Sequence, residues 1–150
     1  MNNQSGIKTN RNELTVLSVS PYEQDHASLQ DIMGHSTWKL LQADKISTAK
    51  NLLHDHAVSV VVCEFQLMPG TWVDMLKHIE PMPNPPSVIV TSRLADERLW
   101  AEALNLGAWD VLPKPFDRSE VIRSVKVAWE HWYHQVPSAA APMSVMRAAS

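Results

Sequence analysis

Short apolar runs alternate along the chain with segments whose apolar residues recur every three or four positions. The short runs predict five β-strands, over residues 15–19, 38–41, 58–63, 87–90 and 110–112. The third and fourth runs are apolar almost throughout, as is typical of strands that helices cover on both faces. We therefore expect these two strands near the centre of a sheet.

The segments that follow the strands predict five helices, each with one apolar stripe. The stripes consist of Leu29, Ile32 and Met33; Ile46, Ala49, Leu52 and Leu53; Trp72, Met75, Leu76 and Ile79; Leu99, Ala103 and Leu106; and Val121, Val125, Ala128 and Trp132. Thr71 and Asp74 have the spacing of a capping box, and Asp117 stands where the last helix should begin. Gly34 and Gly107 stand where helices should end.

Five alternating strand and helix units predict one α/β domain, a doubly wound, five-stranded parallel sheet flanked by five helices, as in flavodoxin-like folds. Such folds place their chemistry where the carboxyl ends of the strands meet. The residues to consider are therefore those that end the predicted strands. They are Ser20, Pro21, Glu64, Thr91 and Lys114.

Composition and charge predict the domain boundaries and the cellular compartment of the protein. The chain of 150 residues is 45% hydrophobic, which suffices for one domain over residues 13–135, between tails at 1–12 and 136–150 that we expect to be disordered. The formal charge of −3, without a dense basic run, disfavours nucleic-acid binding. The single cysteine, Cys63, and the lack of a long apolar run predict a cytoplasmic protein that does not enter the membrane.

Three segments carry a family resemblance. The segment 107–116, GAWDVLPKPF, ends a strand with Lys-Pro-Phe, the segment 88–92, VIVTS, ends one with a hydroxyl residue, and the segment 67–70, LMPG, contains a Pro-Gly loop. Together they resemble the receiver domain of bacterial two-component response regulators, and the similarity covers residues 14–134. The resemblance implies a role in phosphorelay signal transduction instead of enzymatic catalysis.

In that family, an acidic pair after the first strand holds Mg²⁺, an Asp that ends the third strand accepts phosphate, and a Thr and a Lys contact the phosphoryl oxygens. Here the acidic pair aligns with Ser20 and Pro21, and the acceptor aligns with Glu64. Thr91 and Lys114 are kept. The resemblance therefore implies a degenerate member, a pseudo-receiver.

The departures have a physical consequence at the metal position. Mg²⁺ requires oxygen ligands, usually carboxylates, whereas Ser20 offers one neutral oxygen and Pro21 offers none. We therefore expect no Mg²⁺ cofactor and no metal-dependent phosphorylation. Glu23 and Asp25 lie just downstream, and we interpret them as first-turn acids stabilised by the helix dipole.

Glu64 is one methylene longer than Asp, which moves its carboxylate toward Lys114. We expect it to pair with Lys114 and to accept a hydrogen bond from Thr91. Two interpretations stay open: Glu64 imitates the phosphorylated state, with less charge than a phosphate, or it forms a structural ion pair left over from lost chemistry.

The resemblance also implies a switch and a contact face. The family's switch aromatic on the last strand aligns with Val111, which is short and β-branched, so the usual rotamer swing is not available. Tryptophans gather on the last two helices and the last strand, the face by which the family meets partners. Trp100, Trp109 and Trp129 are therefore a candidate interaction surface, whereas Trp132 lies on the core stripe.

The function predicted is that of a stand-alone pseudo-receiver, which contacts a histidine kinase, a downstream regulator or a second copy of itself. One alternative is a phosphorylatable single-domain response regulator, and another is a small-molecule-binding flavodoxin-like domain. We predict no catalytic residues and no metal site. The paired histidines His54 with His56 and His131 with His134 lack a third ligand nearby in sequence.

Overall fold

The computed structural model describes residues 13–135, and the predicted tails lie outside this range. The strands are β1 (Thr15–Val19), β2 (Lys39–Ala43), β3 (Val60–Glu64), β4 (Ser87–Ser92) and β5 (Asp110–Pro113). The helices are α1 (Glu23–Met33), α2 (Ile46–Asp55), α3 (Trp72–Ile79), α4 (Glu97–Leu106) and α5 (Arg118–Gln135). The first predicted strand has the observed bounds, and the bounds of the other four shift by at most two residues.

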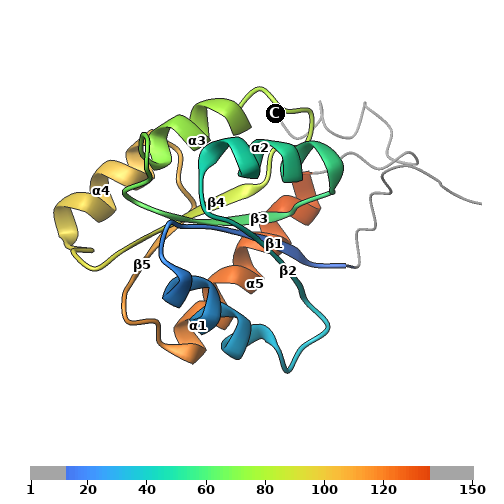
Figure 1. Cartoon of the computed structure of the whole chain (residues 1–150), viewed down its shortest axis with the longest axis horizontal. Helices are drawn as coiled ribbons and strands as arrows, with labels where there is room; N and C mark the ends of the chain where they lie inside the picture. Colours follow the sequence, from blue (N-terminus) through green and yellow to red (C-terminus); the bar gives the residue numbers. More distant parts are fainter. Residues whose placement is uncertain (1–12, 136–150) are drawn as a thin grey trace, which may run out of the picture.

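The five strands form one parallel sheet in the order β2-β1-β3-β4-β5, which confirms the predicted doubly wound topology. Helices α1 and α5 cover one face, and α2, α3 and α4 cover the other (Figure 1). The strand order reverses direction between β1 and β3, so the carboxyl ends of these strands border the switch point where such folds place their sites.

Alternation along the buried strands divides the core into two layers. On β3, Val61 and Cys63 pack with α2, α3 and α4, while Val60 and Val62 pack with α1 and α5. The central strand is thus buried on both faces, as its uninterrupted apolar run predicts. Strand β1 is buried to the same degree, which the sequence pattern indicated less clearly.

The helix ends follow the predicted signals, but one residue predicted on a buried stripe does not. Thr71 and Asp74 form the capping box at the start of α3. Gly107 ends α4 with φ of 120°, a left-handed conformation that favours glycine. Leu106 was expected on the buried stripe of α4, but it is 46% exposed. That prediction is wrong because α4 ends at Leu106 and its buried stripe stops at Ala103.

No helix within residues 13–135 is long and apolar enough to cross a membrane.

Candidate functional site

The predicted pocket residues meet at the carboxyl edge of the sheet. Ser20 directly follows β1, Glu64 is the last residue of β3, and Lys114 directly follows β5. Thr91 on β4 lies in register with Glu64. Because β1, β3, β4 and β5 are neighbours in the sheet, residues far apart in sequence converge on one site.

The side chain of Lys114 is at the centre of this site. Its Nζ lies 2.8 Å from Asp25 Oδ2 and 2.5 Å from Glu64 Oε1, and the side chain is only 8% exposed. The ammonium also lies 5.0 Å from the centre of the Tyr22 ring, within the range of a cation–π contact. Burial lowers the pKa of Lys114, but the hydrogen bond to Asp25 and the proximity of Glu64 more than offset this, and the pKa is raised overall.

Asp25 is one of two residues of this site whose role sequence reasoning missed. It does lie in the first turn of α1, but its carboxylate turns inward and is buried. Besides the Lys114 contact, its Oδ2 accepts a hydrogen bond of 2.6 Å from the Ser20 hydroxyl. The Ser20 oxygen in turn accepts from the backbone N–H of Tyr22 at 3.0 Å. The interpretation of Asp25 as a first-turn acid stabilised by the helix dipole is therefore incomplete, because its carboxylate also binds Ser20 and Lys114.

Glu64 forms the expected ion pair with Lys114. The partner of Oε1 in this contact is the Lys114 ammonium. Oε2 accepts a hydrogen bond of 3.0 Å from the backbone N–H of Gln66. The expected hydrogen bond from Thr91 is absent: the Thr91 side chain is buried without one, and its backbone oxygen accepts from Phe65 at 2.8 Å. That prediction is wrong because the Gln66 backbone in the turn after β3 donates to one oxygen of Glu64, and the Lys114 ammonium lies against the other.

His26, which sequence reasoning also missed, supports the site from beneath. Its Nε2 lies 2.9 Å from the carbonyl oxygen of Ser20, and its Nδ1 lies 2.9 Å from the hydroxyl of Ser18. A carbonyl oxygen can only accept, so Nε2 carries a hydrogen and donates it. The buried ring thus fastens α1 to the end of β1, which holds Asp25 close to Lys114.

A hollow of about 520 Å³ opens outside Lys114. Tyr22, Asp25, Lys114 and Phe116 line it, together with the exposed Arg93 from the loop after β4. The site is therefore a buried cluster of charges with an open mouth, and Arg93 adds a second positive charge at its rim.

The predicted interaction surface has an uneven exposure. Trp100 on α4 is 49% exposed, whereas Trp109 and Trp129 are half-buried. Trp129 packs against the core layer of α1 and α5. Trp132 is buried at 3% exposure, so its assignment to the core is confirmed. Trp100 is therefore the most exposed of the three predicted surface tryptophans.

Beside Trp100 lies the position of the switch aromatic. Val111 is 7% exposed, and a hollow of about 240 Å³ lies over it, lined also by Ala95, Trp100 and Pro113. A short side chain on β5 thus leaves an open hollow on this face.

A doubly wound sheet in this strand order, with a lysine at the end of β5 directed toward the end of β3, defines a phosphoreceiver-like signalling fold. The sequence model of one protein family, the response regulator receiver domain, matches residues 7–126 of the chain. The chain belongs to the response regulator receiver domain family.

Solved structures agree on the fold. A signal receiver domain of an HD domain-containing protein from Pseudomonas fluorescens Pf-5 superposes with a TM-score of 0.75 at 24% identity, over 85% of this chain and 94% of that one. The receiver domain of a LuxO repressor-like protein from Vibrio parahaemolyticus gives 0.75 at 17% identity, over 82% and 95%. The beryllofluoride-activated NtrC4 receiver domain dimer gives 0.71 at 24% identity, over 79% and 98%. No curated protein matches the sequence.

The family implies a magnesium ion at this edge, but the donor set present here does not fit one. The carboxylates of Asp25 and Glu64 both contact the Lys114 ammonium, and the Ser20 hydroxyl donates to Asp25. A divalent ion would need the oxygens that already neutralise the lysine. No cluster of three or more His, Cys, Asp or Glu suited to a metal occurs among residues 13–135.

Proposed function

We propose that this receiver domain signals by protein contact and does not undergo magnesium-dependent aspartyl phosphorylation. The observation that carries the proposal is the ion-pair triad of Lys114 with Asp25 and Glu64. The lysine that the family directs at a phosphoryl group is here neutralised by carboxylates of the chain itself. The domain is thus a non-enzymatic module with no need of a metal cofactor.

Electrostatics oppose phosphoryl transfer at this site. A dianionic phosphoryl donor that approaches Glu64 would meet two carboxylates and one ammonium, and the ammonium is already shared between them. Metal ions normally neutralise the charge of the transferring group, and no acidic pair at Ser20 and Pro21 recruits one. Glu64 Oε2 also accepts a hydrogen bond from the Gln66 backbone, which lowers its nucleophilicity.

The contact face proposed is that of α4, β5 and α5. Trp100 is large, aromatic and half exposed, and such residues are enriched at binding hot spots. The partner is a histidine kinase, a downstream regulator or a second copy of the domain. Because the triad does not depend on phosphate, this contact should form equally with and without a phosphodonor.

Phosphorylation can be tested with acetyl phosphate and Mg²⁺, followed by intact-mass measurement. We expect no phosphoryl adduct on the wild-type protein. The matched positive control is the triple variant Ser20→Asp, Pro21→Asp, Glu64→Asp, which restores the family's acids and should gain a Mg²⁺-dependent adduct. An adduct on the wild-type protein that disappears in Glu64→Gln would overturn the proposal.

One observation favours the alternative of a phosphorylatable response regulator. Asp25 brings a carboxylate into the pocket, although from α1 instead of the end of β1. If Asp25 served as a displaced metal ligand, Mg²⁺ would promote an adduct on Glu64 that Asp25→Asn abolishes. The same mass measurement on Asp25→Asn therefore separates the two functions.

A further inference from the structure

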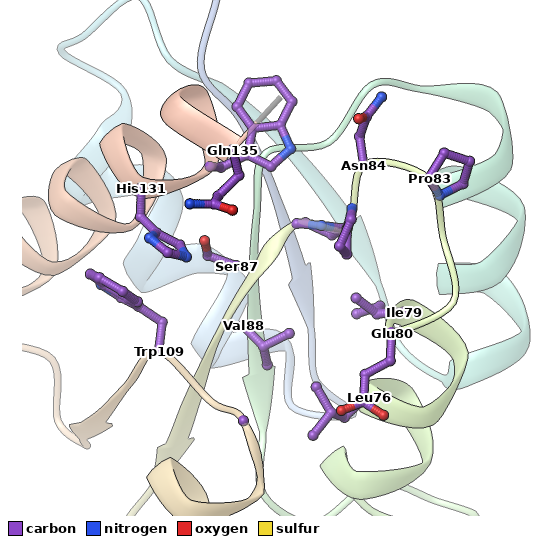
Figure 2. A pocket seen from close by; sticks show the side chains of 14 residues that line it. Leu76, Ile79, Glu80, Pro83, Asn84, Ser87, Val88, Trp109, His131 and Gln135 are labelled. Atoms are coloured by element: carbon purple, nitrogen blue, oxygen red, sulfur yellow. The ribbon is translucent and has the colours of Figure 1, made fainter. Parts of the chain in front are cut away.

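A second cavity, of about 410 Å³, lies at the opposite edge of the sheet from Lys114. It opens beside the start of β4, between α3 and α5 (Figure 2). Val88 lies between the two walls, with Trp109 and His131 on one side and Ile79 and Glu80 on the other. Its volume falls within the range of small-molecule sites.

One wall of this cavity is aromatic and firmly held. The rings of Trp109 and His131 stack with centroids 4.4 Å apart at an angle of 21°. The Trp109 backbone N–H donates to the Val88 carbonyl at 2.6 Å, so the wall is attached to β4. The Ser87 hydroxyl donates to the Ala128 carbonyl at 3.1 Å and ties α5, which carries His131, to the same strand.

The rim of the cavity is also restrained. Pro83, Pro85 and Pro86 line it in the loop between α3 and β4. Proline fixes φ and carries no N–H group, so this loop has few alternative conformations. A cavity with fixed walls and rim requires little ordering when it binds a ligand, which favours affinity.

The charge of the lining selects the ligand. Glu80 is the single carboxylate among the residues that line the cavity, and no lysine or arginine lines it. Within residues 13–135 the Glu80 carboxylate makes no ion pair. The lining also includes Trp132, whose buried indole N–H has no hydrogen-bond partner in the described part of the chain. A phosphate would be repelled here, whereas a cation would find an unpaired counter-charge.

We propose that this cavity binds a planar aromatic molecule that carries a positively charged nitrogen group. The aromatic part packs against Trp109, His131 and Val88, and the cationic group pairs with Glu80. The indole ring of Trp132 lies at the same cavity and reports on its occupancy. The proposal is independent of the lysine triad and of the signalling mode proposed above.

Three probes of one shape test it: 2-naphthamidine (cationic), 2-naphthamide (neutral) and 2-naphthoate (anionic). Binding is followed by the indole N–H resonances of the ¹⁵N-labelled protein, with Trp109 and Trp132 assigned from single Trp→Phe variants. We expect saturable shifts of both resonances by 2-naphthamidine, with a Kd on the order of 0.1 mM. The neutral probe should bind about threefold more weakly and the anionic probe more weakly still.

Glu80 is exposed, so Glu80→Gln should weaken 2-naphthamidine by about threefold and leave 2-naphthamide unchanged. The matched control is Glu102→Gln, which removes an exposed carboxylate on α4 outside the cavity. Equal binding of all three probes, no saturable shift at Trp109 and Trp132, or equal weakening by both Gln variants would each overturn the proposal.

Discussion

Lys114 Nζ and Asp25 Oδ2 lie 2.8 Å apart although 89 positions separate the two residues in the sequence. The contact joins the first turn of α1 to the end of β5, across the carboxyl edge of the sheet. It places a carboxylate beside the lysine from α1, whereas Ser20 and Pro21 at the end of β1 carry none. The Asp25 carboxylate therefore contacts the lysine directly.

Lys114→Met should lower the free energy of unfolding by about 3 kcal/mol, because it leaves two buried carboxylates without a counter-charge. Urea unfolding at pH 7 measures the change. The control is Lys126→Met on the exposed side of α5, which should change little. The double variant Lys114→Met, Glu64→Gln should be more stable than Lys114→Met alone, since it removes one of the two unpaired charges. If Lys114→Met and Lys126→Met lower the free energy of unfolding equally, the triad does not stabilise the fold.

Ser20→Ala should lower the free energy of unfolding by about 1–2 kcal/mol, because Ser20 donates to Asp25 and accepts from Tyr22 at a buried position. The same urea measurement applies. Ser119→Ala, which removes a hydroxyl from the exposed start of α5, is the matched control and should leave the unfolding midpoint unchanged. A similar small effect of both variants would show that the Ser20 bonds add nothing net.

The fold was predictable because each of its elements is encoded by a local periodicity. The run from Thr15 to Val19 has the observed bounds of β1, and the stripe from Val121 to Trp132 marks the buried face of α5. The Glu64–Lys114 pair was also predictable, because both residues end strands that must converge. The site of Asp25 was not, because a first-turn acid has two possible orientations. The position of Asp25, five residues after Ser20, could have indicated the contact, because the first turn of α1 then brings its carboxylate to the Ser20 hydroxyl.

Alkaline pH should destabilise the protein through Cys63. Burial, with a smaller contribution from Glu64, raises the pKa of the Cys63 thiol far above its ordinary value of 9.0. Above pH 9.0 the unfolded chain therefore releases a proton that the folded protein retains, and stability falls as pH rises. Between pH 8 and pH 10 this group should cost about 1.4 kcal/mol.

The measurement for Cys63 compares urea unfolding of the wild type and Cys63→Ala at pH 8 and pH 10. The variant has a lower stability at both values but should lose less on going to pH 10. The raised pKa of Lys114 acts in the same direction, mainly above about 10.5, and acts equally on the wild type and the variant. Equal losses in the two proteins would show that the thiol is accessible to water in the folded state.

The tryptophans should separate stability from recognition. Trp132→Ala removes a side chain that is 3% exposed, and should cost about 3–5 kcal/mol of unfolding free energy. Trp100→Ala removes one that is 49% exposed, so the free energy of unfolding should change by less than about 0.5 kcal/mol.

If α4, β5 and α5 form the contact face, Trp100→Ala should nonetheless weaken association at least tenfold, because a half-exposed indole contributes most when a partner buries it. Sedimentation of the purified domain measures self-association, and the same variant in a pull-down with a kinase or regulator measures contact with another protein. Unchanged association by Trp100→Ala in both measurements would place the contact face elsewhere on the domain.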